Sequence, residues 1–80
     1  MDGRAVTRTD LEEILRLAEV DPSYYNVERE AEGLCLLREG QLWKVFVKER
    51  AERYEERTFA TEDDACVYFL KRIFQLWRRK

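Results

Sequence analysis

The sequence predicts an α+β fold: a helix, a three- to four-stranded antiparallel sheet, and a C-terminal helix packed on one sheet face. Two observations support this prediction. Apolar residues recur at helical spacing near both ends of the chain, and the middle holds runs of strand-forming residues. A length of 80 residues and a hydrophobic fraction of 45% indicate one folded domain, residues 1–80.

The first helix is predicted to begin at Thr9, because Thr9 and Glu12 have the spacing of a capping box. Apolar residues follow at helical spacing, at Leu11, Ile14, Leu15 and Ala18. The charged residues expected to face solvent are Glu12, Glu13, Arg16 and Glu19. Pro22 cannot continue a helix, so the helix is expected to end near Val20.

The strands are predicted from the middle of the chain. Residues 24–30 suggest a short, edge-like strand. Residues 34–37 and 42–47 are richer in strand formers, and the short connection between them contains Gly40, which predicts a β-hairpin. On the second of these strands Trp43, Val45 and Val47 share one face, because side chains alternate along a strand.

The charged segment 48–58 has two interpretations. As a helix, it would use strong helix formers and the favourable spacing of Glu49 and Arg53. As a second hairpin, one strand would end at Glu49, a turn would lie near Ala51, and residues 54–59 would return. We prefer the hairpin, because Phe59 leads straight into the next helix and opposite charges across two strands stabilise a sheet.

The last helix is predicted to begin at Thr61, where a threonine precedes an acidic residue by three positions, and to run toward Trp77. Phe69 and Ile73 recur at helical spacing, and we expect them to meet the apolar face of the central strand in one core. The helix is apolar over more than one stripe. A homodimer through this helix is therefore an alternative, with the surface near Phe74 and Trp77 buried by a second copy or a partner.

The composition argues against several functional classes. The chain has no histidine, so the commonest general base is missing and we expect no catalytic activity, no metal site and no cofactor. Cys35 and Cys66 are expected to be small core residues. With a net charge of −2, nucleic-acid binding is not expected, and the basic residues near the C-terminus suit the end of a helix. The longest apolar run has six residues and the first ten residues lack an apolar core, so a cytoplasmic location is expected.

An acidic region lies in the first half of the chain. Eight acidic residues and two arginines between Thr9 and Glu32 give a local balance of −6. Such a surface could steer a basic protein partner, or it could be a solvated helix face followed by an acidic loop, and the two interpretations are evenly matched. The predicted partner-binding residues are Asp21, Tyr24, Tyr25, Glu28, Glu30 and Glu32.

Residues 25–66 carry a pattern of matching residues: Tyr25-Asn26-Val27-Glu28, Glu32, Cys35-Leu36, Trp43, Val45, Glu49-Arg50, Phe59 and Thr61-Glu62-Asp63-Asp64-Ala65-Cys66. This pattern resembles small bacterial immunity proteins, which are encoded beside polymorphic toxins. Similar proteins usually carry glycine directly after the glutamate-arginine pair, where this chain has Ala51. The resemblance implies a non-enzymatic, antitoxin-like inhibitor that binds a cognate toxin domain and blocks its active site. The alternative is a homodimeric structural or interaction module without a toxin partner.

Overall fold

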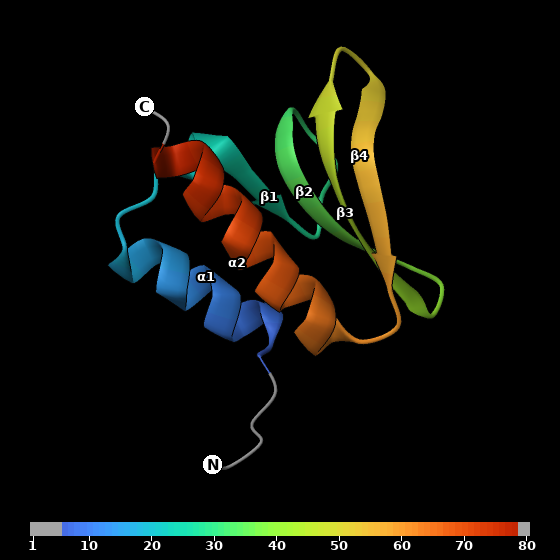
Figure 1. Ribbon diagram of the computed structural model, residues 1–80, viewed down its shortest axis with the longest axis horizontal. Coiled ribbons are helices and arrows are strands. Elements are labelled where there is room, and N and C mark those ends of the chain that lie inside the picture. The colour runs from blue at the N-terminus through green and yellow to red at the C-terminus, as the bar shows by residue number, and fades with distance from the viewer. Residues whose placement is uncertain (1–5, 79–80) are drawn as a thin grey trace.

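The computed structural model describes the backbone of residues 6–78 and the side chains of residues 6–75. The elements are α1 (Arg8–Leu17), the short 3₁₀ helix η1 (Pro22–Tyr24), β1 (Tyr25–Val27), β2 (Gly33–Glu39), β3 (Leu42–Glu49), β4 (Glu52–Phe59) and α2 (Glu62–Arg78). Both α-helices lie on one side of a four-stranded sheet (Figure 1), which confirms the predicted α+β class. Neither of these two helices has the length and apolarity needed to cross a membrane.

The sheet is mixed, so the prediction of a purely antiparallel sheet was wrong for one strand. The order is β1-β2-β3-β4, with antiparallel pairing of β2–β3 and β3–β4 but parallel pairing of β1 with β2. Parallel neighbours usually need a connection of a dozen residues or more, whereas only residues 28–32 join these two. The buried side chain of Asn26 holds this short loop, because its amide donates to the carbonyls of Ala31 (3.2 Å) and Glu32 (3.0 Å).

The capping box of α1 is formed by Thr7 and Asp10, two residues earlier than predicted. The Thr7 hydroxyl accepts from the N–H of Asp10, and the Asp10 carboxylate accepts from the N–H of Thr7, both at 3.2 Å. Contacts from α2 explain the earlier start. The carboxylate of Asp63 accepts from the N–H of Val6 (2.7 Å), and that of Glu62 accepts from the N–H of Arg8 (2.8 Å). These bonds satisfy backbone donors that a helix start leaves open.

The end of α1 comes three residues before the predicted one. Glu19 has φ 60, and its N–H donates to the carbonyl of Arg16, while the N–H of Val20 donates to that of Leu15. This is the Schellman arrangement, in which a left-handed residue ends the helix and the next residue packs back on it. Val20 is accordingly buried. The chain leaves the helix here, before Pro22 could interrupt it.

The charged segment forms the predicted second hairpin, and the helix interpretation of residues 48–58 is wrong. β3 ends at Glu49, β4 begins at Glu52, and Arg50 and Ala51 have φ 52 and 70. Two consecutive positive φ values are typical of a type I′ turn, whose twist matches that of paired strands. The carboxylate of Glu32 accepts from the N–H of Arg50 (2.9 Å), which ties this turn to the β1–β2 loop.

A β-bulge interrupts β4. Val45 pairs with Arg57 and Val47 with Tyr54, so two residues of β4, Glu55 and Glu56, lie opposite one residue of β3. The extra residue is Glu55, which has φ 55. Its carboxylate forms an ion pair with Arg72 of α2, and the bulge therefore directs one acidic side chain to the helical side of the sheet.

The core lies between the helices and the sheet. Trp43, Val45, Phe69 and Ile73 are buried in one cluster with the buried residues of α1, as predicted. Val47 is partly buried against the same cluster. Thr61 caps α2 as predicted, its hydroxyl accepting from the N–H of Asp64 at 3.1 Å. Cys35 and Cys66 are both buried and unpaired, which confirms them as core residues.

Candidate functional site

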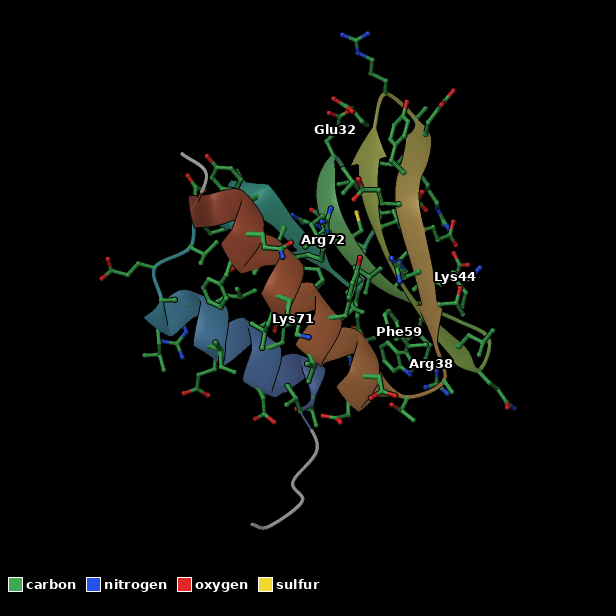
Figure 2. All side chains as sticks on the ribbon, viewed as in Figure 1. Glu32, Arg38, Lys44, Phe59, Lys71 and Arg72 are labelled. Carbon is green, nitrogen blue, oxygen red and sulfur yellow. The ribbon has the colours of Figure 1, made fainter. Side chains whose placement is uncertain are left out.

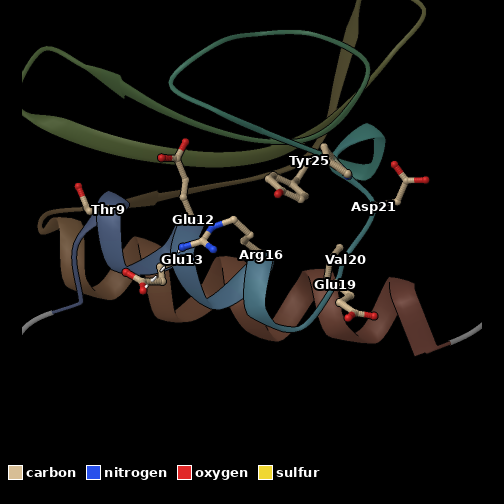
Figure 3. A pocket seen from close by; sticks show the side chains of 9 residues that line it. Thr9, Glu12, Glu13, Arg16, Glu19, Val20, Asp21 and Tyr25 are labelled. Carbon is tan, nitrogen blue, oxygen red and sulfur yellow. Dashed lines mark ion pairs between the residues drawn. The ribbon is translucent and has the colours of Figure 1, made fainter.

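An open groove of about 860 Å³ runs along α1, on the side of the helix that faces η1 and β1 (Figure 3). Residues from three consecutive elements line it: Thr9, Glu12, Glu13, Arg16, Glu19, Val20, Asp21, Pro22 and Tyr25. All of them belong to the acidic region that the sequence singled out. The groove is therefore formed by the first part of that region, residues 9–25.

Local backbone geometry brings these side chains together. Residues 9, 12, 13 and 16 lie within two turns of α1, so they share one side of the helix. The reversal at Glu19 then turns the chain back, and Asp21 opens η1 by accepting from the N–H of Ser23 (2.9 Å). Tyr25, at the start of β1, has its ring over the groove, with Arg16 on one side and Asp21 on the other (Figure 3).

The groove has a negative electrostatic character. Four carboxylates and one guanidinium line it, a formal balance of −3. Among the described residues, the guanidinium of Arg16 pairs with the carboxylate of Glu13, at 3.7 Å, and both side chains are largely exposed. Such a contact is screened by water and contributes little. The exposed carboxylates of Glu12 and Glu19 favour the approach of a cation, and the half-buried ring of Tyr25 adds an apolar surface to the groove.

The six residues predicted to bind a partner do not form one surface. Asp21 and Tyr25 line the groove. Tyr24 and Tyr25 are both half-buried and pack against the hydrophobic core, but only Tyr25 also lines the groove. Glu28 forms an ion pair with Arg8, next to the contact between Arg8 and Glu62. Internal contacts therefore already occupy Tyr24 and Glu28.

Glu30 and Glu32 lie on the other side of the molecule from the groove. Glu32 accepts from the turn of the β3–β4 hairpin, and Figure 2 shows it beside those strands. The carboxylate of Glu30 accepts from Lys48 (2.6 Å) and from two nitrogens of Arg53 (3.0 and 3.1 Å). Hydrogen bonds from Arg53 and then from Lys48 lower the pKa of Glu30 from 4.5 to about 2.

An ion-pair network covers the sheet face that the helices leave open. Arg53 also contacts Glu39 (2.8 Å) and Glu56 (3.5 Å), and its guanidinium lies 4.2 Å from the ring centroid of the buried Phe46. Lys44, labelled in Figure 2, joins the same two carboxylates. Hydrogen bonding to Arg53 lowers the pKa of Glu39, and hydrogen bonding to Glu56 raises that of Lys44.

The composition of this network accounts for the alternating charge of β3 and β4. Its members are three cations, Lys44, Lys48 and Arg53, and three carboxylates, Glu30, Glu39 and Glu56. Because the charges balance, the open sheet face carries little field of its own. The groove, where carboxylates exceed cations, is the better candidate for recognition.

The described residues offer little nucleophilic or metal chemistry. No group of three or more potential ligands among them could hold a metal ion. Burial raises the pKa of the Cys66 thiol to about 11, so the thiolate is scarce near neutral pH. The distinctive chemistry of the described surface is thus its charge distribution.

Comparison with known protein families, with curated proteins and with solved structures found no match. The site is therefore described from its own residues. Four charged residues of the groove are absent from the predicted partner-binding set: Glu12, Glu13, Arg16 and Glu19. Their helical periodicity had been recognised, but it was assigned to a solvated helix face. What the sequence did not indicate is that the chain reverses at Glu19 and lays Tyr25 beside that face.

Proposed function

We propose that this protein is a non-enzymatic immunity protein that binds a toxin domain and covers its active site. The observation that carries the proposal is the gathering of four carboxylates around Tyr25 in one groove. The resemblance of residues 25–66 to bacterial immunity proteins supplies the class of partner. The absence of histidine from the sequence is consistent with inhibition by binding.

The chemistry of the groove selects a basic partner surface. Lysine and arginine side chains complement the carboxylates, and a guanidinium can also lie against the ring of Tyr25. Charge complementarity of this kind mainly accelerates the encounter between two proteins, while packed aromatic residues slow their dissociation. The groove offers both kinds of group within one surface.

The contact set proposed here combines two of the predicted residues with three that the structure adds. Asp21 and Tyr25 remain, and Glu12, Glu13 and Glu19 join them. For Tyr24, Glu28, Glu30 and Glu32 partner binding stays a prediction. To contact a partner, those four residues would lose the internal packing, ion pairs and hydrogen bonds described above.

Charge reversal in the groove tests the proposal. Glu12 and Glu13 are exposed on α1, so Glu12→Lys/Glu13→Lys changes the groove without removing a buried contact. The matched control is Glu49→Lys/Glu52→Lys, which changes the net charge equally at the tip of the β3–β4 hairpin. The partner tested is the toxin domain that the proposal expects a neighbouring gene to encode, and association is measured by stopped-flow fluorescence at low and high salt.

The groove variant is expected to associate at least about tenfold more slowly at low salt and to show a flatter salt dependence, because steering is lost. The control should associate like the wild type. Tyr25→Ala should weaken binding by about 2 kcal/mol if the ring is an anchor, whereas Tyr25→Phe should keep most of the affinity. Wild-type association by the groove variant, with full protection of cells from the toxin, would refute the proposal.

A further inference from the structure

The helical layer has an apolar strip on its outer surface, separate from the groove. Leu17 of α1 is 70% exposed, and Ile14, one turn earlier, is 38% exposed. On α2, Val67 is 40% exposed, and Leu70 and Phe74 are half-buried. Exposed aliphatic residues that occur singly are ordinary, but here five apolar residues follow two neighbouring helices.

The packing of each helix defines the position of the strip. On α1, the buried residues Leu11 and Leu15 separate two flanks of the helix. Glu12 and Arg16 lie on the flank that lines the groove, and Ile14 lies on the other flank. On α2, the ring of Tyr68 packs at a tilt against that of Phe59, and Arg72 pairs with Glu55, so that side faces β4. Val67, Leu70 and Phe74 therefore occupy the side toward α1. The two helices begin side by side, joined through Arg8 and Glu62 (Figure 1).

The charges beside the strip are of opposite sign on the two helices. Glu13 flanks Ile14 and Leu17 on α1, and its one long contact to Arg16 leaves it available. Lys71 lies between Val67 and Phe74 on α2, is exposed, and forms no ion pair with any residue of the described part. Figure 2 shows Lys71 on the front of α2, above α1.

We propose that two copies of this chain associate through this helical face, with α1 of one copy against α2 of the other. A two-fold axis along the helices makes the surface self-complementary, because it sets an apolar strip on an apolar strip and acid opposite base. Leu17 then packs against Val67, Phe74 and the aliphatic stem of Lys71 of the second copy, and the ammonium of Lys71 reaches Glu13.

A second copy suits this surface better than another protein, because this chain itself carries the apolar strip, the acidic group (Glu13) and the basic group (Lys71) that such an interface would pair. Glu13 lies at the edge that the strip shares with the groove, whereas Glu12, Asp21 and Tyr25 lie away from the strip and remain open in such a dimer. The inference therefore does not depend on the proposed toxin target. Sequence reasoning pointed to the surface near Phe74; Leu17 and Ile14 are added by the structure, and the side chain of Trp77 lies outside the described residues.

Sedimentation equilibrium of the full chain, from low to high micromolar concentration, measures the association. We expect the mass of the wild type to rise from one chain to two. Leu17→Glu, and Leu17→Gln as a milder variant, should weaken the dimer at least about tenfold, a change of about 1.4 kcal/mol. The control is Leu42→Glu, at a residue 43% exposed on β3, away from the helices, and it should dimerise normally.

A charge exchange tests the register. Lys71→Glu and Glu13→Lys should each weaken the dimer, and the double variant should restore it, because acid and base again face each other across the two-fold axis. Circular dichroism checks that each variant is folded. A wild type that stays monomeric throughout would overturn the proposal, as would a dimer indifferent to Leu17→Glu or a double variant that fails to recover.

Discussion

Replacing Ala51 by glycine gives opposite outcomes for the two interpretations of residues 48–58. In the hairpin, Ala51 occupies the second turn position with φ 70, a region that alanine enters with strain. In a helix, the same substitution would place glycine in a helix interior. The sign of the stability change therefore distinguishes the two structures.

The magnitude follows from two opposing terms. The left-handed conformation costs an L-residue roughly 1–2 kcal/mol, and glycine removes that cost. The greater conformational freedom of glycine in the unfolded chain destabilises the fold by about 0.5–1 kcal/mol. Because the methyl group of Ala51 is exposed, no packing is lost. The net stabilisation is about 0.5–1 kcal/mol, or a rise in Tm of roughly 2–8 °C for a domain of this size. A helix would instead be destabilised by about 1 kcal/mol.

Thermal unfolding followed by tryptophan fluorescence and by circular dichroism measures this change. Ala60→Gly is the matched control, because Ala60 is exposed and does not have a positive φ, so glycine should be neutral or destabilising there. A lower Tm for Ala51→Gly than for the wild type would refute the type I′ turn.

Two further predictions concern the core and the open sheet face. Phe69→Ala should cost about 3–5 kcal/mol in urea unfolding, because the ring is fully buried, whereas Val67→Ala on the same helix should cost much less; equal costs would contradict the packing. The pKa of Glu30 is lowered from 4.5 to about 2 in the fold, so its ionised carboxylate stabilises the protein at pH values above 4.5. This contribution is lost as the pH falls toward about 2. The urea midpoint of Glu30→Gln should therefore depend less on pH than that of the wild type between about pH 5 and about pH 2, and identical pH profiles would contradict the role of Arg53.

Most of the secondary structure could be predicted because local patterns determine it. Three local patterns predicted observed elements: the alternation of apolar residues along β3, the glycine of the first hairpin, and the threonine cap of α2. The start of α1 was misplaced because both Thr7 and Thr9 precede an acidic residue by three positions. The choice between them depends on Glu62 and Asp63, which are distant in sequence.

The parallel pairing of β1 could not be predicted, because it depends on a side chain rather than on a pattern. A connection of five residues normally joins antiparallel strands, and the hydrogen bonds of Asn26, together with positive φ values at Glu28 and Gly33, show how this loop turns back. The bulge at Glu55 is equally invisible in the sequence. Its φ is positive although the residue is neither glycine nor asparagine.

The distribution of charge along the sequence indicated which segment carries the candidate groove, but not which residues line it. The acidic balance pointed to the segment that lines the groove, and two of the predicted residues, Asp21 and Tyr25, are among its lining residues. Charge counting could not separate carboxylates that face outward from those already paired inside the fold. Glu30 and Glu32 belong to the second kind, because β3 and β4 supply their partners from later in the chain.

The contacts that start α1 also set the order in which this protein can fold. The backbone N–H groups of Val6 and Arg8 donate to Asp63 and Glu62, which follow them in the sequence by 57 and 54 positions. A ten-residue helix is too short to persist alone in water. During synthesis the first helix therefore emerges early but gains its partners only when Asp63 has left the ribosome. Contacts between residues so far apart in the sequence cost loop-closure entropy, which slows folding. A chain truncated before residue 62 would carry every acidic residue of the groove without the helix that arranges them.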